Sequence, residues 1–354
     1  MNKLTYLIVG SGYRAEFYGR IAARYPELFR AAFLCRSEEK AAMMKERTGV
    51  DAATSVEAGE RLRPDFVVVA VNKTSIADVA AEWAERGYPV LSETPAGSSL
   101  EQLTRLWELR ETRNARITVA EQYHRYPELA AGLDAVARGR IGTPYSACLS
   151  LAHDYHAASL LRRMLQVDGE SFVMRGGSAE SPIVETDSRY GPITDGRVAE
   201  KTRDVVHITY ASGKRAVYDF SGVQYRSFIR SRHLTVRGDR GEWTDNLLLY
   251  LDEQGRPQRE YLKPLIEESY RCLDTPELRA LRRDWRPELR METAQDEYAV
   301  ATMLLDMGVY LKGGAEPYPL REALDDAYFW LLLQQAVAAP WTAARAQRMP
   351  WNIR

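Results

Sequence analysis

The chain has 354 residues, a length that predicts two domains rather than one core. Its 48 basic and 49 acidic residues nearly balance, which argues against a dedicated nucleic-acid or acidic-lipid surface. Its three cysteines, Cys35, Cys148 and Cys272, are too few and too far apart for a disulfide framework. No run of about 18 apolar residues predicts a membrane span, and no signal-like segment precedes the first strand, so we expect a cytoplasmic protein.

The N-terminal segment combines a buried strand, a glycine turn and a helix. The strand begins near residue 4 and leads into Gly-Ser-Gly-Tyr-Arg-Ala at residues 10–15. Gly10 permits a tight turn, Gly12 lets backbone N–H groups approach a pyrophosphate, and Ala15 lets the helix pack on the strand. The start of the helix adds N–H donors and a partial positive charge. We therefore predict a dinucleotide-binding turn, in which we include Tyr13 and Arg14.

Strands and helices alternate through residues 1–122, which predicts an open, doubly wound parallel sheet of the Rossmann type. A continuous apolar run such as Phe66–Val71 is typical of a parallel strand that is covered on both faces. The other expected strands are Arg30–Cys35, Pro89–Glu93 and Arg116–Ala120, and the clearest helices are Ser75–Arg86 and Leu100–Thr112.

Residues 123–354 follow a different rhythm, which predicts a second, α+β domain with a large and mostly antiparallel sheet. Gly176–Lys201 is rich in Gly, Ser, Pro and Asp, so we expect a long loop there. The predicted strands are Tyr145–Leu151, Phe172–Ser178, Val205–Tyr210, Lys214–Ser221, Phe228–Val236 and Leu247–Leu251, so His207 and His233 should be sheet residues. The predicted helices are Pro127–Arg138, Ala157–Leu165, Glu292–Lys312 and Leu320–Ala339.

The residues after the second strand bear on the choice of cofactor. An acidic residue there would bind the ribose hydroxyls of NAD, whereas a basic residue would accommodate the 2′-phosphate of NADP. Arg36, Ser37 and Lys40 offer a guanidinium, a hydroxyl and an ammonium group, so we predict NADP, with NAD possible through Glu38 or Glu39. Alternatively, Ser37 is simply the N-cap of a helix.

The ordered set of motifs resembles the glucose-fructose oxidoreductase / inositol dehydrogenase / MocA family over nearly the whole chain. The motifs are the glycine turn, Val71-Asn72, Glu93-Thr94-Pro95 in place of Glu-Lys-Pro, the link Gly139–Pro144, His156 at the head of a helix, and the turn Val236–Glu242. The resemblance implies an oxidoreductase acting on a small molecule, built from a nucleotide-binding domain and a second domain whose sheet forms a dimer or tetramer interface.

The same resemblance places further residues along the cofactor, namely Asn72 and Lys73 and the motif Glu93, Thr94 and Pro95. In the family, the lysine of that motif lies near the nicotinamide and helps proton transfer. Thr94 occupies its position here, and a threonine hydroxyl does not exchange protons near neutral pH as a tuned lysine does. The proton is therefore expected to come from another residue.

His156 matches the family's catalytic histidine, and Tyr155 and His153 are the alternatives. Two nearby carboxylates that the family often has are replaced by Ala152 and Ser159. Alternatively, Asp154 is the N-cap of the helix, and His153 and Tyr155 only have a structural role at its start. His153 and His156 have the spacing of metal ligands, but no third ligand is evident, so we predict no metal.

Gln122, Tyr123 and His124 follow the last predicted strand of the first domain, where the family contacts sugar-like substrates. We predict that they bind substrate together with His153, although such residues are just as often structural. The leading hypothesis is an NADP-dependent oxidoreductase acting on a carbonyl or hydroxyl of a sugar-like or polyol-like molecule. The rivals are a nucleotide-binding sensor without catalysis, which the missing lysine permits, and a reductase of conjugated imines or alkenes.

Overall fold

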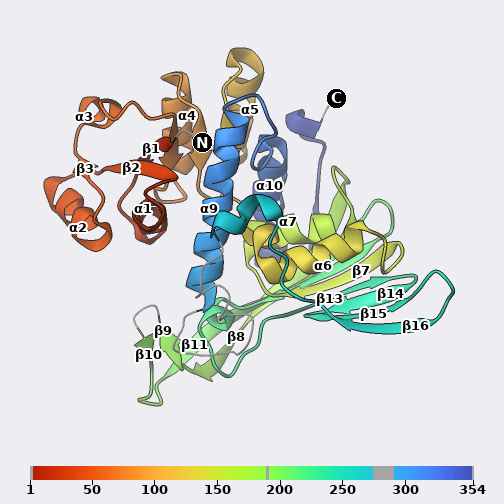
Figure 1. Ribbon diagram of the computed structural model, residues 1–354. Helices are drawn as coiled ribbons and strands as arrows, with labels where there is room; N and C mark the ends of the chain where they lie inside the picture. Colours follow the sequence, from red (N-terminus) through yellow and green to blue (C-terminus); the bar gives the residue numbers. More distant parts are fainter. Residues whose placement is uncertain (1–2, 189–190, 274–290, 353–354) are drawn as a thin grey trace. The chain divides into compact units, whose positions relative to one another are not determined.

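The computed structural model describes residues 3–188, 191–273 and 291–352, and their elements are drawn in Figure 1. The chain forms two compact units. Unit 1 comprises Met1–Tyr126, Ile266–Ala327 and Arg354, and unit 2 comprises Pro127–Leu265 and Tyr328–Ile353. The chain thus leaves unit 1 after residue 126 and returns at residue 266, whereas the sequence analysis drew a single boundary between residues 122 and 123.

Unit 1 contains a six-stranded parallel sheet in the order β3-β2-β1-β4-β5-β6, which confirms the predicted doubly wound fold. Its central strands are buried because helices cover both faces, and Tyr6, Leu7 and Ile8 are all inaccessible to solvent. The strand order reverses between β1 and β4, so the ligand crevice of such a sheet is expected at their carboxyl ends. The strands are β1 (Leu4–Val9), β2 (Phe29–Leu34), β3 (Ala52–Ala53), β4 (Phe66–Val69), β5 (Val90–Ser92) and β6 (Ile117–Val119).

The helices of unit 1 come from both ends of the chain. Gly308 on the C-terminal helix α9 lies against Leu4 of β1, where an added Cβ would come within 2.8 Å of the leucine side chain. The helices are α1 (Tyr13–Arg24), α2 (Glu38–Thr48), α3 (Val56–Glu60), α4 (Ile76–Glu85), α5 (Leu100–Arg113) and α9 (Met291–Tyr310), with 3₁₀ turns η1 (Tyr123–Arg125) and η3 (Glu268–Leu273). Helix α10 (Leu320–Ala338) begins in unit 1 and continues into unit 2.

Unit 2 contains a nine-stranded sheet in the order β16-β15-β14-β13-β7-β12-β11-β8-β17, in which only the β7–β12 pair is parallel. This confirms the predicted large and mostly antiparallel sheet. Gly132 of α6 lets that helix approach the sheet, since a Cβ there would come within 1.9 Å of the Trp243 ring. The strands are β7 (Pro144–Ser150), β8 (Phe172–Val184), β11 (Val198–Tyr210), β12 (Arg215–Phe220), β13 (His233–Gly238), β14 (Gly241–Thr244), β15 (Leu247–Leu251), β16 (Pro257–Tyr261) and β17 (Ala344–Arg345). The helices are α6 (Pro127–Ala137) and α7 (Asp154–Leu165), with 3₁₀ turns η2 (Gly222–Tyr225) and η5 (Pro350–Asn352).

Two predictions in this unit are wrong. Gly176–Lys201 is not a loop, because β8 and β11 pair along their whole lengths and carry the short strands β9 (Asp187–Ser188) and β10 (Gly191–Pro192). Gly176 is needed for that pairing, since a Cβ there would lie 2.1 Å from the Val205 carbonyl oxygen. In addition, β13 begins at His233, so the strand predicted from Phe228 is too long. His207 and His233 do lie in strands, as predicted.

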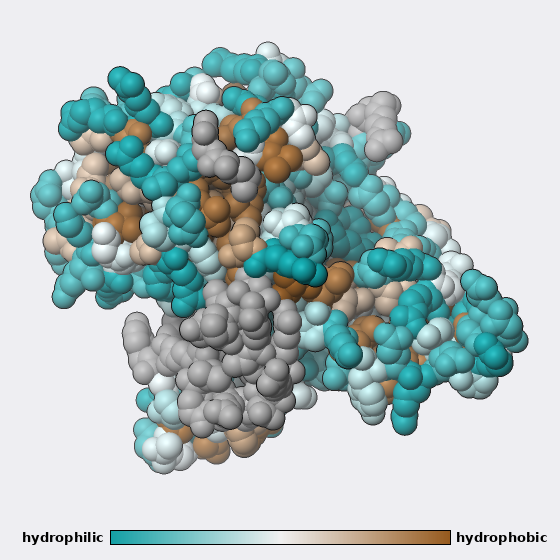
Figure 2. Space-filling model, viewed as in Figure 1, coloured by the Kyte–Doolittle hydropathy of each residue, from teal (hydrophilic) through white to brown (hydrophobic). Residues whose placement is uncertain are grey.

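The surface is consistent with the composition. Polar and charged side chains cover most of the face in view, with apolar side chains in smaller patches between them (Figure 2). Across the described residues, no helix has both the length and the apolar character that a membrane crossing requires.

Candidate functional site

The glycine turn after β1 has the geometry of a phosphate cradle. Gly10 has φ +140°, and a Cβ on it would lie 2.2 Å from the carbonyl oxygen of Ala70, just after β4. Gly12 is the N-cap of α1, and no other residue lies within 4 Å of the position that a Cβ on Gly12 would occupy. Ala15 is fully buried, so the helix starts close to the strand. The start of α1 therefore suits an anion such as a pyrophosphate.

The predicted 2′-phosphate residues follow β2 and are exposed. Ser37 caps α2, because its hydroxyl oxygen accepts a hydrogen bond from the backbone N–H of Lys40 at 3.3 Å. The capping alternative for Ser37 is therefore correct, and its hydroxyl hydrogen can still be donated to another acceptor. Arg36 and Lys40 are exposed on the same turn.

The segment after β4 is a side-chain-stabilised turn. The Asn72 side-chain oxygen accepts hydrogen bonds from the Thr74 hydroxyl at 2.7 Å and from the Ser75 backbone N–H at 3.1 Å. This pattern fixes the turn that leads into α4. Asn72 and Lys73 are exposed at this edge of the sheet.

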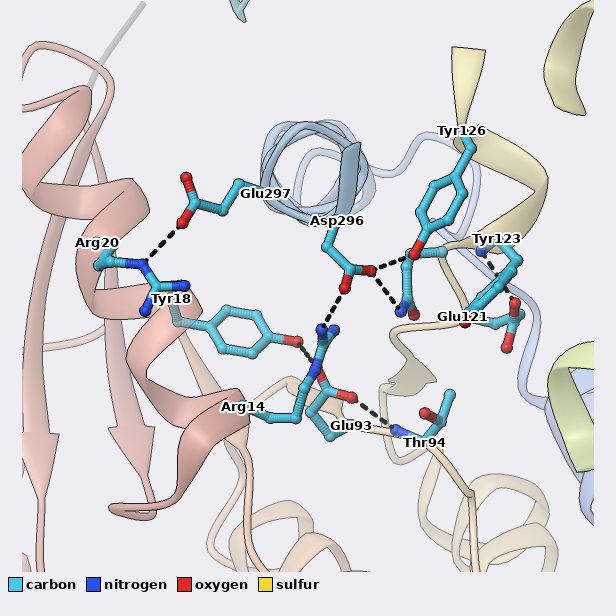
Figure 3. Close-up of polar contacts among 11 residues, drawn as sticks. Arg14, Tyr18, Arg20, Glu93, Thr94, Glu121, Tyr123, Tyr126, Asp296 and Glu297 are labelled. Atoms are coloured by element: carbon cyan, nitrogen blue, oxygen red, sulfur yellow. Dashed lines mark hydrogen bonds and ion pairs between the residues drawn. The ribbon is translucent and has the colours of Figure 1, made fainter. Parts of the chain in front are cut away.

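Glu93, directly after β5, is a buried carboxylate with several donors (Figure 3). One of its oxygens accepts from Arg14 Nε at 3.0 Å and from the Tyr18 hydroxyl at 2.9 Å, and it lies 2.8 Å from Arg14 Nη2. Its other oxygen accepts from the Thr94 backbone N–H at 3.2 Å. The Thr94–Pro95 peptide that follows is cis. Since a buried carboxylate is costly unless it is paired and hydrogen-bonded, these donors hold Glu93 in place.

Arg14 is shared with a second carboxylate, Asp296 of α9, whose Oδ2 lies 3.4 Å from Arg14 Nη1 (Figure 3). The other oxygen of Asp296 accepts from Gln122 Nε2 at 3.1 Å and from the Tyr126 hydroxyl. Burial opposes the charge on Arg14, but the Glu93 and Asp296 carboxylates outweigh it and hold the pKa of Arg14 well above its ordinary value. We call Arg14, Glu93 and Asp296 the shared-arginine cluster.

Sequence reasoning missed the Tyr18, Tyr126 and Asp296 contributions to this cluster. Tyr18 lies one turn after Arg14 on α1, so the helical spacing was a usable signal. Asp296 lies far along the chain on α9, and no local pattern marks it.

Of the residues predicted to bind substrate, Gln122, Tyr123 and His124 lie in unit 1 with the glycine turn, whereas His153 lies in unit 2. Tyr123 is buried and stacks on Tyr126 with ring centroids 4.8 Å apart, and its backbone N–H donates to Glu121 at 3.1 Å. The His124 ring lies 5.5 Å from that of Tyr318. These contacts are structural, and the substrate role of Gln122, Tyr123 and His124 stays a prediction.

Unit 2 gathers His153, Tyr155 and His156 at the start of α7. The ring centroids of His153 and His156 are 4.8 Å apart, and those of Tyr155 and His156 are 4.6 Å apart. His156 is only 4% exposed. The Tyr225 hydroxyl lies 2.5 Å from His153 Nδ1 and accepts from the His153 backbone N–H at 3.0 Å.

The start of α7 departs from the expected capping. His153, not Asp154, is the N-cap, and Asp154 is the first helical residue, with φ +49°. The Asp154 backbone N–H donates to the buried Tyr218 hydroxyl at 3.3 Å. Such a left-handed conformation at a non-glycine residue costs energy and is common at functional sites. Among the described residues, no three potential ligands gather in a way that would hold a metal ion.

Residues 4–121 match the GFO_IDH_MocA family, described as an oxidoreductase family with an NAD-binding Rossmann fold. That match covers about a third of the chain. Among curated proteins, none matches the chain in sequence.

Several solved structures are similar to this protein in fold over nearly the whole chain. An oxidoreductase domain protein from Kribbella flavida has a TM-score of 0.72 at 15% identity, covering 98% of this chain and 100% of that one. Levoglucosan dehydrogenase, in complex with NADH and levoglucosan, has a TM-score of 0.71 at 15% identity, with 97% and 99% covered. An Agrobacterium radiobacter oxidoreductase in complex with NAD⁺, L-tartaric acid and magnesium has a TM-score of 0.70 at 13% identity, with 97% and 98% covered.

Proposed function

We propose that this protein is an NADP-dependent oxidoreductase that transfers hydride between nicotinamide and a carbonyl or hydroxyl of a sugar-like or polyol-like small molecule. The observation that carries the proposal is the glycine turn, in which α1 begins after Gly12 beside open space, within residues 4–121, which match an oxidoreductase family with an NAD-binding Rossmann fold. A bound nicotinamide cofactor would supply or accept the hydride.

The residues of the first domain bind and orient that cofactor. Backbone N–H groups at Gly12 and Tyr13 receive the pyrophosphate. Arg36, Ser37 and Lys40 receive the 2′-phosphate, because a guanidinium, a hydroxyl and an ammonium group all donate hydrogen bonds to phosphate oxygens. Proteins with structures similar to this one are recorded with NAD⁺ or NADH, so preference for NADP rests on these three residues alone.

The proton is moved by His156 in this proposal, with Tyr155 beside it. Thr94 supplies no group that titrates near neutral pH, whereas imidazole does. Gln122, Tyr123, His124 and His153 contact substrate. We also propose a cytoplasmic homo-oligomer, a dimer or tetramer.

A specific observation favours a second candidate, a nucleotide-binding sensor that does not turn over substrate. Threonine at residue 94 removes the titrating side chain that the family uses, while Glu93 and the glycine turn keep the contacts that hold the fold together.

Calorimetric titration and turnover assays separate the candidates. We expect NADPH to bind at least tenfold more tightly than NADH, and Arg36→Glu to abolish that preference. A tenfold tighter binding of NADH would reject the NADP assignment, and no heat with any nicotinamide nucleotide would reject the function. Stoichiometric binding without turnover on a broad panel of sugars, polyols and ketones would favour the sensor. For an active enzyme, His156→Gln is expected to lower kcat by about 10²–10⁴ without weakening nucleotide binding.

A further inference from the structure

The shared-arginine cluster, beside the carboxyl end of β5, contains more carboxylates than cations. In the shared-arginine cluster one guanidinium serves two carboxylates, Glu93 and Asp296. The groups around these carboxylates, from Arg14, Tyr18, Gln122, Tyr126 and the Thr94 backbone, all donate hydrogen bonds or positive charge. The cluster therefore carries a net charge of minus one.

The cluster lies at a defined end of the proposed nucleotide site. In a sheet of this order, a dinucleotide crosses the switch point with its adenosine half beyond β2 and its other half beyond β4 and β5. Glu93 directly follows β5, and Arg14 stands at the start of α1 beside the glycine turn. The unbalanced charge is thus at the nicotinamide end.

A second feature of the same cluster points to a ligand. Gln122 is 3% exposed, and while its Nε2 donates to Asp296, its Oε1 is buried without a hydrogen-bond partner. A buried acceptor without a donor is costly and calls for an explanation. A ligand that carries N–H or O–H groups, such as the carboxamide of nicotinamide, would supply the donor.

We propose that the shared-arginine cluster makes this protein selective for the oxidised, positively charged form of the nicotinamide ring over the reduced, neutral form, and that Thr94 preserves this selectivity where a lysine would cancel it. The inference rests on the proposed function and deepens it. The oxidised and reduced cofactors carry the same phosphates and differ in the ring, so a change in the ratio of their dissociation constants between matched variants reports the effect of charge near the ring.

The test is the ratio of Kd for NADPH to Kd for NADP⁺, measured by titration at low salt in the full-length protein. Asp296→Asn removes one negative charge and Thr94→Lys adds one positive charge. One unit charge about 8 Å from the ring, at an effective dielectric constant of about 30, changes this ratio about tenfold. We expect both variants to lower the ratio by about that factor.

Matched controls isolate the cluster. Glu297→Gln removes the same charge from the next residue of α9, whose carboxylate pairs with Arg20 at 2.7 Å instead. Thr94→Gln lengthens the side chain without adding charge. Both controls are expected to leave the ratio within twofold of the wild-type value.

The outcomes are distinct. The inference is overturned if the wild-type ratio is one or less, if both charge variants stay within twofold of the wild-type ratio, or if the controls shift it equally. Should Asp296→Asn fail to fold, the comparison of Thr94→Lys with Thr94→Gln decides alone. A wild-type protein that binds neither form would instead overturn the proposed function, and the inference with it.

Discussion

Replacing Arg14 with methionine tests whether the shared-arginine cluster holds unit 1 together. The Glu93 side chain is 5% exposed and that of Arg14 is 27% exposed, so the substitution leaves a buried carboxylate without its cation. Tyr18 and the Thr94 N–H remain as donors, but both are neutral. Methionine keeps much of the arginine side chain's apolar packing.

The size of the effect follows from these exposures. Breaking a fully buried ion pair by removing one partner costs about 3–5 kcal/mol. Because the guanidinium is partly exposed, we expect Arg14→Met to lower the free energy of unfolding by about 2–3 kcal/mol. The measurement is denaturant unfolding followed by fluorescence and circular dichroism. Arg20→Met is the matched control on the same helix. Its partner Glu297 keeps a second cation, Arg24, at 3.7 Å, so this variant should lower the free energy of unfolding by less than about 1 kcal/mol.

A double-mutant cycle decides whether charge is the cause. If it is, adding Glu93→Gln to Arg14→Met removes the unpaired charge, so the double variant should be at least about 1 kcal/mol more stable than the sum of the two single losses predicts. Strict additivity, or an Arg14→Met loss no larger than that of Arg20→Met, would refute the reasoning.

Two further predictions use the same unfolding assay. Gly10→Ala should lower the free energy of unfolding by about 3 kcal/mol or prevent folding, because the new Cβ would lie 2.2 Å from the Ala70 carbonyl oxygen and φ at this position is +140°. Gly12→Ala has open space around it, so it should lower the free energy of unfolding by at most about 1 kcal/mol and yet weaken nucleotide binding. Equal losses of stability at both positions would contradict this prediction. Burial and the Asp306 carboxylate raise the pKa of Tyr270 to about 12, with Arg125 opposing them. The neutral form of Tyr270 is therefore favoured in the folded state. The free energy of unfolding should fall by about 1–2 kcal/mol between pH 10 and 12, after allowance for partial exposure. Tyr270→Phe should reduce that alkaline loss, and a pH dependence of stability that is unchanged in this variant would contradict the prediction.

The sequence was most informative where structure is local. The turn at Gly10 and Gly12 follows from two glycines at the end of an apolar strand, and Phe66–Val71 identifies a strand by its unbroken hydrophobicity. The large second sheet followed from strands that succeed one another with turns between them. Each of these signals depends on neighbours in the chain, so periodicity and turn residues were sufficient.

Long-range pairing was not predictable in the same way. Gly176 and Pro182 argued for a loop, yet they lie in a 13-residue strand that pairs with β11 along its full length. Similarly, Arg14 was assigned to the cofactor on its position in the glycine turn alone. Its ion pairs with Glu93 and Asp296 arise only when β5 and α9 come together around α1.

The donors on Glu93 also separate binding from proton transfer. One of its oxygens accepts hydrogen bonds from Arg14 and Tyr18, and the other accepts one from the Thr94 N–H, so both oxygens help to hold the motif. Thr94 has no side-chain group that exchanges a proton near neutral pH, so the role of this motif is to hold the Glu93 carboxylate in place. The candidate proton carriers, His153 and His156, belong to unit 2. Substitutions around Glu93 should therefore change nucleotide affinity first, whereas substitutions of the histidines should change kcat and its pH profile first.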